Sequence, residues 1–200
     1  MTWWWLLLVP SYVLGVFPSA LLVGRLTGHD PTREGSGNPG ASNVYRVAGR
    51  SAGAATLVAD IAKGALPTAV GLVVQDRALA LACGIAAVAG HVAPVTRRFR
   101  GGKGVATTGG MSLVLYPFVS LALIALWVVV LKVFKRASIG SLVLCVALPI
   151  GVALRSRPWG EVVTVTLVAV AIIGRHHENI RRLLHRQEGA LPSVRGARSD

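Results

Sequence analysis

Apolar residues fall into long runs along the chain, and short polar segments rich in arginine and lysine separate the runs. Several runs approach the roughly 20 residues that a helix needs to cross a bilayer. The pattern therefore predicts an all-α fold, a polytopic membrane bundle of about seven transmembrane helices. The expected helices cover residues 1–26, 51–74, 78–95, 105–115, 117–131, 138–154 and 161–174.

The apolar stretch over residues 105–131 is expected to hold two helices rather than one. A single helix of this length would extend about 40 Å, which exceeds a hydrocarbon core of roughly 30 Å. A glycine pair and the Tyr116-Pro117 step interrupt the stretch. Two spans here also place the basic turn 132–136 on the same side of the membrane as the other basic loops.

The orientation is predicted from the positive charges, which favour the cytoplasmic side. The basic tail after Arg175 is placed in the cytoplasm, and seven spans then leave the N-terminus outside. No basic segment precedes the first apolar run, so a cleaved signal peptide is not expected. The tryptophans of Trp3–Trp5 instead indicate an interfacial anchor. One membrane-embedded domain is expected over residues 1–188, followed by a disordered basic tail over 189–200.

Composition narrows the class of protein further. Hydrophobic residues make up 53% of the chain and charged residues 14%, whereas soluble proteins carry about 25% charged residues. The formal net charge of +13 would suggest nucleic acid in a soluble protein. No stacking aromatics interleave with the basic clusters, so an anionic substrate or anionic membrane lipids are expected and nucleic acid is not. Cys83 and Cys145 lie inside apolar runs, which leaves no disulfide framework and no cysteine metal site.

Two ionisable residues, Asp60 and Lys63, lie inside the second apolar run. Such residues are costly in a span and usually face the bundle interior or a polar cavity. They are one helical turn apart, so they are expected to pair with each other. The pair either supports the structure or helps to hold a site.

A first polar segment, residues 35–46, is rich in glycine, serine and asparagine and ends in an arginine. Glycines let the backbone approach an anion, and arginine binds phosphate through two hydrogen bonds. The alternative is an ordinary loop. The candidate site residues here are Ser36, Gly37, Asn38, Gly40, Asn43 and Arg46.

A second polar segment, residues 101–107, directly precedes an apolar helix. Free N–H groups at a helix N-terminus beside a lysine favour phosphate binding. The segment is not a Walker A loop, because Arg97 stands where that motif needs its first glycine and Gly104 stands where it needs Ser or Thr. The candidate residues are Gly101, Gly102, Lys103, Gly104 and Thr107.

Histidines mark the remaining candidate positions. His176 and Asn179, three residues apart at the end of the last span, are expected to share one helix face and to position a substrate group. A zinc site there is poorly supported, since no carboxylate or cysteine cluster accompanies the histidine. His91, at a helix end before a proline, is expected to be structural. His29 and Glu34 have the spacing of the His-x4-Asp acyltransferase signature, with Glu in place of Asp, but one such pair in a loop is a weak signal.

These segments, taken in order, resemble the membrane-embedded acyl-phosphate:glycerol-3-phosphate acyltransferases, the PlsY family. Its Ser-Gly-Asn-x-Gly-Ala-Thr-Asn-x-x-Arg motif matches residues 36–46, with Ser42 in place of threonine. Its Gly-His-x-Phe-Pro and Gly-Gly-Lys-Gly-Val-Ala-Thr motifs match residues 90–107, with Ala93 in place of phenylalanine. Its Arg-His-x-x-Asn-Ile-x-Arg-Leu motif, ending in a glutamate, matches residues 175–188, with Arg186 where the family usually has glycine.

The resemblance implies transfer of a fatty acyl group from acyl phosphate to glycerol 3-phosphate. The products would be 1-acylglycerol 3-phosphate (lysophosphatidate) and inorganic phosphate, in the first step of phospholipid biosynthesis. It also implies a multi-pass protein of a bacterial-type inner membrane with its site facing the cytoplasm, and functional coupling to an enzyme that produces acyl phosphate. No cofactor or metal is implied.

Roles for individual residues follow as hypotheses. Catalysis is expected to involve Ser36, Arg46, Lys103, His176 and Asn179. The glycines, asparagines and threonine named above would bind substrate or phosphate. Structural support would come from Asp60, Lys63, His91 and Glu188, the last through pairing with arginine. The base is either His176 or a phosphate oxygen of the substrate. Ser36 is not expected to act as a nucleophile, because no histidine–carboxylate pair is evident to activate it.

Other functions remain open at this point. A transporter of phosphate or organic anions would also use basic residues and broken helices, but it should show charges deeper in several spans or an internal repeat. An acyltransferase that uses acyl-CoA or an acyl carrier protein is the nearest enzymatic alternative. The identity of the acyl donor separates these enzymes.

Overall fold

The computed structural model describes residues 3–74 and 76–191, and over these ranges the chain forms helices, turns and loops without strands. The predicted all-α fold is confirmed. In chain order the elements are η1 (Trp3–Leu7), α1 (Leu8–Val16), α2 (Ser19–Leu26), α3 (Ala41–Val73), α4 (Arg77–Val92), η2 (Val95–Arg97), α5 (Val105–Leu115), α6 (Pro117–Phe134), α7 (Ala137–Leu154), α8 (Trp159–Arg175) and α9 (His177–Leu184).

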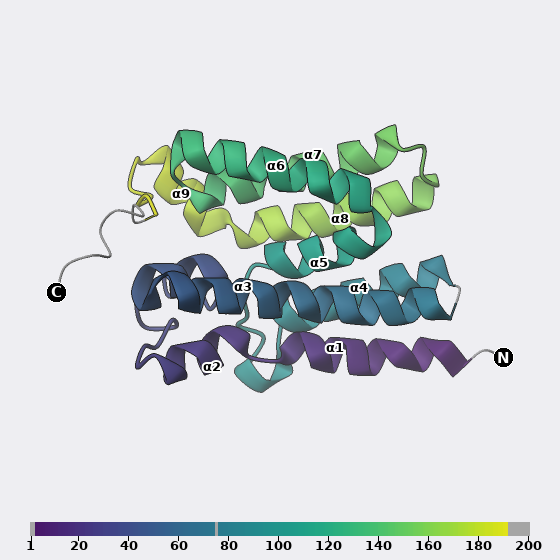
Figure 1. The fold of residues 1–200 in the computed structure, drawn as a ribbon, viewed down its shortest axis with the longest axis horizontal. Helices are drawn as coiled ribbons and strands as arrows, with labels where there is room; N and C mark the ends of the chain where they lie inside the picture. The colour runs from purple at the N-terminus through teal and green to yellow at the C-terminus, as the bar shows by residue number, and fades with distance from the viewer. Residues whose placement is uncertain (1–2, 75, 192–200) are drawn as a thin grey trace.

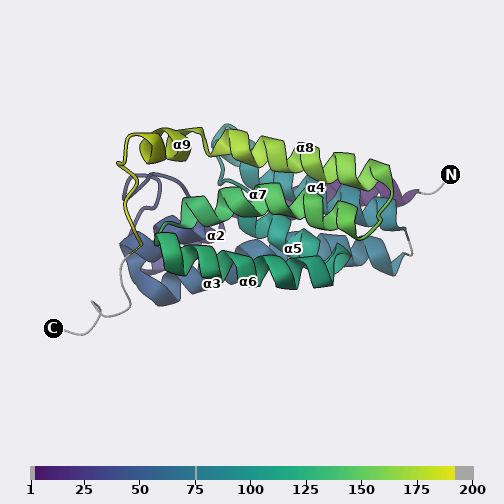
Figure 2. The same ribbon diagram turned by 90° about the horizontal axis from the view of Figure 1, so that it is seen from above.

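The long helices lie side by side along one axis, in two groups joined by α5 (Figure 1). The first group holds α1, α2, α3 and α4, and the second holds α6, α7 and α8. The short helix α5 packs against α3 and α4 and leads into α6. Helices α2 and α9 and the start of α3 lie at one end of the bundle, and η1 lies at the other, in both views (Figures 1 and 2).

Among the residues that the structure describes, five helical segments are long and apolar enough to cross a membrane. They are Trp3–Leu26, Ala41–Val73, Arg77–Arg97, Pro117–Phe134 and Ala137–Leu154. Helices α8 and α9 would form a sixth segment together, bent by 58° between them. The stretch 105–131 does hold two helices, α5 and α6, and Pro117 is the first residue of α6. The total of seven spans and the orientation stay predictions.

Glycines let the central helices approach closely. A Cβ added at Gly64 of α3 would lie 1.9 Å from the carbonyl oxygen of Thr107 in α5, and one at Gly110 of α5 would lie 2.0 Å from that of Ile61. Small residues at the interface are the usual means of helix association in lipid, where no hydrophobic force between helices remains. These contacts hold α5 against α3 and so position the loop that precedes α5.

Two predicted segments differ from the structure. The first apolar run is two helices, because Pro18 has no backbone N–H to continue α1. The polar stretch before the second run is helical from Ala41 onwards, although Gly49 interrupts the helix with a φ of 88°. Such a φ is open to glycine and costly for other residues. The helix therefore carries the end of the first motif, including Arg46.

An unpredicted ion pair ties the two groups of helices together at the η1 end of the bundle. The Arg77 Nε of α4 lies 2.7 Å from the Glu161 Oε1 of α8, and the Tyr116 hydroxyl donates to the other carboxylate oxygen at 2.8 Å. The Arg77 guanidinium also stacks over the Tyr116 ring. Its role is structural, since none of the three residues lines the large cavity described below.

Candidate active site

A cavity of about 390 Å³ lies among α3, α5, α6, α7 and α8. This volume is within the range of small-molecule sites. Part of its lining is polar and comes from the three predicted motifs, and part is apolar and comes mainly from α6 and α7. The polar part includes Ser36, Asn38, Arg46, Lys103, His176, Asn179 and Glu188; the apolar part includes Leu123, Ile124, Trp127, Leu144 and Leu148.

The second and third motifs meet directly inside this cavity. The Lys103 ammonium donates a hydrogen bond to the Asn179 side-chain oxygen. The Asn179 amide nitrogen in turn donates to Glu188 Oε1 at 2.8 Å, and Arg182 Nε donates to Glu188 Oε2 at 2.9 Å. The expected pairing of Glu188 with an arginine is therefore present. This series of hydrogen bonds orients Lys103 and leaves the remaining N–H bonds of its ammonium group available to an anion.

The charged groups in this series of hydrogen bonds affect one another's pKa values. Burial lowers the pKa of Lys103 to about 8, although the Glu188 carboxylate opposes the shift. Burial works against ionisation of Glu188 as well, but hydrogen bonds from Arg182 and Asn179 hold the pKa of this carboxyl below its usual value. At neutral pH the site therefore keeps a lysine cation beside an ionised glutamate.

Two of the glycines beside Lys103 have a packing role. The Gly102 N–H donates to the His91 carbonyl at 3.1 Å, and a Cβ at Gly102 would lie 2.2 Å from His91 Nε2. A Cβ at Gly101 would lie 2.0 Å from the same carbonyl oxygen. Neither glycine lines the large cavity, whereas Gly104, the N-cap of α5 with a φ of 91°, does. The loop needs glycines because it is pressed against the end of α4.

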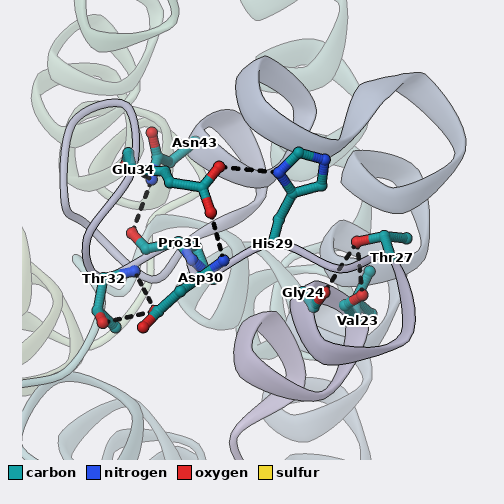
Figure 3. A network of polar contacts seen from close by, with 9 residues as sticks. All are labelled: Val23, Gly24, Thr27, His29, Asp30, Pro31, Thr32, Glu34 and Asn43. Atoms are coloured by element: carbon teal, nitrogen blue, oxygen red, sulfur yellow. Dashed lines mark hydrogen bonds and ion pairs between the residues drawn. The ribbon is translucent and has the colours of Figure 1, made fainter.

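The first motif is held by Asn43, whose side chain serves the loop itself (Figure 3). Its amide nitrogen donates to the carbonyl oxygens of Pro31 and Glu34 at 2.8 and 3.0 Å, and its side-chain oxygen accepts from the Ser36 N–H at 2.8 Å. Asn43 is 2% exposed. Asn43 also lines the large cavity, so its expected role in substrate binding stays a prediction beside its role in folding the loop that presents Ser36.

The other residues of the first motif separate into two groups. Ser36, Asn38, Gly40 and Arg46 line the cavity, and Gly37 does not. Arg46 Nη2 has a long contact of 3.5 Å with the Gly189 carbonyl oxygen, and the buried Arg46 Nε has no partner among the described residues. An arginine with so few internal contacts is suited to bind an incoming anion.

Two expectations for the other motifs need correction. His176 and Asn179 do not share a continuous helix face, because α8 ends at Arg175 and the chain bends at His176 before α9. Both nevertheless line the cavity. Thr107 is fully buried between α5 and α3 and does not line it; Thr108, the next residue, does.

The tautomer of His176 follows from its contacts. Its Nδ1 lies 2.8 Å from the Ile172 carbonyl oxygen, which can only accept. Nδ1 therefore carries a proton, and Nε2 of the neutral ring is the nitrogen left to accept one. The ring is 2% exposed, which restricts its motion.

Asp60 and Lys63 form the predicted pair, with 2.8 Å between Oδ1 and Nζ. Lys63 also donates to the Phe17 carbonyl oxygen at 2.8 Å and to the Ser19 hydroxyl at 3.0 Å. His91 Nδ1 lies 3.4 Å from Lys63 Nζ. Lys63 thus adds a hydrogen bond to the Phe17 carbonyl at the α1–α2 break, which also accepts from the Ser19 N–H at 3.0 Å. His91 of the same cluster packs against Gly102. Structural support is the role that these contacts favour.

Neither His29 nor Glu34 lines the large cavity. The two side chains contact each other in the loop after α2 (Figure 3). Its nitrogen and oxygen are 2.8 Å apart, and the second Glu34 oxygen accepts from the Asp30 N–H at 2.6 Å. The backbone hydrogen bond from Asp30 and the contact with His29 hold the pKa of Glu34 below its usual value. These contacts fold the loop after α2. Within residues 3–74 and 76–191, no group of three or more His, Cys, Asp or Glu side chains is placed to hold a metal ion.

Comparison with known proteins assigns the chain to a family. Residues 5–186 match the family model described as Glycerol-3-phosphate acyltransferase. The chain belongs to this family. The glycerol-3-phosphate acyltransferases of Syntrophotalea carbinolica and Rubrobacter xylanophilus are 39% and 41% identical to it, over 94% and 92% of this chain and 97% and 92% of theirs. The chain is thus an acyltransferase enzyme.

Solved structures of this family share the fold. PlsY (YgiH), an integral membrane glycerol 3-phosphate acyltransferase in its glycerol 3-phosphate form, superposes with a TM-score of 0.89 at 30% identity, covering 94% of this chain and 96% of that one. Its lysophosphatidic acid form gives a TM-score of 0.83 at 31% identity, covering 92% and 93%. The apolar helices of this acyltransferase therefore belong to an integral membrane protein.

Arg136, which the structure places beside Glu188, lies outside the motifs. Arg182, the second arginine of the third motif, contacts the carboxylate of the same glutamate. Arg136 Nε donates to the Glu188 backbone carbonyl at 2.9 Å. Basic residues at the ends of spans are ordinary, and nothing in the sequence marks Arg136 as different. Only the path of the chain after α9 brings Glu188 to Arg136.

Proposed function

We propose that this acyltransferase moves a fatty acyl group from acyl phosphate to glycerol 3-phosphate. The products are 1-acylglycerol 3-phosphate and inorganic phosphate, and the reaction is the first step of phospholipid biosynthesis. The observation that carries the proposal is the cavity itself. Two cationic side chains, Lys103 and Arg46, line it together with apolar side chains of α6 and α7. This lining suits two phosphorylated substrates, one of which has an acyl chain.

The chemical step needs no group beyond these substrates and the lining residues. A glycerol hydroxyl attacks the acyl carbonyl, the new ester bond forms, and the bond from the carbonyl carbon to the phosphate oxygen breaks. The hydroxyl proton passes to an oxygen of the leaving phosphate or to His176 Nε2. Lys103 and Arg46 stabilise phosphate charge, and Ser36 or Asn38 orients the acyl phosphate. No step is assigned to a metal or cofactor.

The proposed setting is a bacterial-type inner membrane, with the N-terminus outside and the site open to the cytoplasm. The motif residues gather at the α9 end of the bundle, where basic residues are abundant. Acyl phosphate is amphipathic, so an enzyme that produces it at the membrane surface would supply the donor. Glycerol 3-phosphate would enter from the cytoplasm.

The experiment offers palmitoyl phosphate and palmitoyl-CoA in parallel to the purified full chain, with radiolabelled glycerol 3-phosphate. Lysophosphatidate from the acyl phosphate only, and its loss in Lys103→Ala, is the expected result. The matched control is Lys132→Ala, an exposed lysine on α6 outside the cavity. Product from the CoA ester would overturn the proposed donor. Absence of product from either donor, with folded protein, would make anion transport the next function to test.

A further inference from the structure

The chain after α9 returns across the end of the bundle, and we name its residues Glu188–Leu191 the C-terminal strap. The strap is tied to the turn between α6 and α7 by two hydrogen bonds. Arg136 Nε donates to the Glu188 carbonyl at 2.9 Å, and the Leu191 N–H donates to the Lys135 carbonyl at 2.9 Å. A turn that is distant in sequence therefore fixes the backbone of the strap.

The strap also completes the polar end of the cavity. Its Glu188 side chain is 7% exposed and receives hydrogen bonds from Asn179 and Arg182. Asn179 accepts from Lys103. A carboxylate hydrogen-bonded on both oxygens can hold its partners in place only if its own backbone is fixed. The bonds from the α6–α7 turn supply that fixed point.

We infer that Arg136 is a positioning residue for acyl transfer. By holding the backbone of the C-terminal strap it keeps Glu188, and through Glu188 the Asn179–Lys103 pair, aligned in the cavity. The inference rests on the proposed binding of phosphate at Lys103. Arg136 itself does not line the cavity, and the bond it makes is to a backbone carbonyl rather than to a reacting group.

Arg136 differs from an ordinary surface charge in its position, its burial and its hydrogen bond. It is the N-cap residue of α7, and its side chain is half-buried. Its Nε donates a directional hydrogen bond to one particular carbonyl, which a charge exposed to solvent does not. Arg155, the C-cap residue of the same helix, is exposed and has a contact with the Phe118 ring at 5.7 Å. The two arginines therefore form a matched pair at opposite ends of α7.

Lys103 gives a readout that a purely structural role of Arg136 would not change. The carboxylates of Glu188 and Glu178 raise its pKa, and the guanidinium groups of Arg182 and Arg46 lower it. His176 also lies within electrostatic reach of Lys103. Displacement of Glu188 removes the leading source of negative charge, so Lys103 should lose its proton at a lower pH.

The test compares the full-length Arg136→Ala, Arg136→Lys and Arg155→Ala variants, purified in detergent, by kcat and KM for each substrate over a range of pH. For Arg136→Ala we expect kcat/KM to fall at least tenfold and its alkaline limit to move to lower pH. Arg136→Lys can still donate to the carbonyl and should recover most of both properties. Arg155→Ala should match the unsubstituted enzyme.

Unchanged kcat/KM and an unchanged alkaline limit in Arg136→Ala would overturn the inference. If Arg136→Ala does not fold, Leu191→Pro replaces it, since proline deletes the N–H that bonds the Lys135 carbonyl, and Leu191 does not line the cavity. An unchanged pH profile in that variant would overturn the premise that a fixed C-terminal strap aligns Glu188, and the inference with it. Lys103→Ala separates the two proposals. If it keeps full activity, the proposed function of the site fails. If it is inactive while Arg136→Ala is normal, only the positioning role of Arg136 is refuted.

Discussion

Lys103 donates a hydrogen bond to the side-chain oxygen of Asn179, and so joins the loop before α5 to the helix after α8. Because Asn179 donates to Glu188 through its amide nitrogen, it lies between a cation and an anion and satisfies both. An amide can do this and neither a carboxylate nor an ammonium can, since only the amide both donates and accepts. The third motif therefore requires asparagine for its two-sided hydrogen bonding.

Replacement of Asn179 should cause a severe loss of activity. Asn179→Leu removes a hydrogen bond from each of two charged groups, and bonds to charged groups contribute about 1.5–3 kcal/mol each. We expect kcat/KM for glycerol 3-phosphate to fall at least about a hundredfold on that scale. Asn179→Asp should be no better, because it adds a negative charge beside Glu188. Steady-state kinetics of the folded variants tests this, and near-normal kcat/KM in Asn179→Leu would contradict it.

The pH dependence of kcat/KM should have an alkaline limit near the pKa of Lys103, about 8. The sign follows from charge: the ammonium binds phosphate, and it is lost as the pH rises through its pKa. The limit in kcat/KM reports the free enzyme, so bound substrate does not mask it. In Glu188→Gln the limit should move to lower pH, because the carboxylate that raises this pKa is gone. A limit that stays in place in Glu188→Gln would argue against Lys103 as the titrating group.

Gly102→Ala should inactivate the enzyme for a steric reason. The added Cβ would lie 2.2 Å from His91 Nε2, a distance that forces the loop or the histidine to move. Lys103 would move with the loop, so we expect a large loss of activity with only a small loss of thermal stability. The matched control is Gly160→Ala in the first turn of α8, where a Cβ meets no atom within 4 Å and alanine favours the helix. Equal activity in the two variants would show that the loop tolerates displacement.

The buried pair of Asp60 and Lys63 should be important for stability. Asp60→Ala leaves the lysine charge without its carboxylate, which typically costs 3–5 kcal/mol when a buried pair is broken. The double variant Asp60→Leu with Lys63→Met removes both charges and should be more stable than Asp60→Ala alone. It should not reach the stability of the unsubstituted protein, because Lys63 also binds the Phe17 carbonyl. Thermal unfolding in detergent measures all three, and a double variant less stable than the single one would refute this reasoning.

His29 and Glu34 should not take part in catalysis despite their spacing. The Glu34 carboxylate accepts a hydrogen bond from the Asp30 N–H and contacts the His29 ring. Neither His29 nor Glu34 lines the large cavity. We expect His29→Ala to keep kcat and KM and to lower thermal stability slightly. A loss of kcat by tenfold or more without a change in stability would restore this pair as a candidate acid–base group.

Much of the fold was predictable because spans form locally. In lipid each helix must satisfy its own backbone hydrogen bonds, so the length of an apolar run and the positions of its breaks determine a span almost alone. The division of residues 105–131 at Pro117 is an example. The Asp60–Lys63 pair is another, since its members are one turn apart on the same helix.

The motifs, by themselves, already determined which residues could hold phosphate and which family the chain resembles. The tertiary structure decided which of them meet. It brings Lys103 to Asn179, uses Asn43 to fold the loop that presents Ser36, turns Thr107 away from the cavity, and ties the chain after α9 to Arg136. The reason is physical: each of these contacts joins segments far apart in sequence, and it depends on how closely packed helices place their ends, which no local pattern of residues specifies.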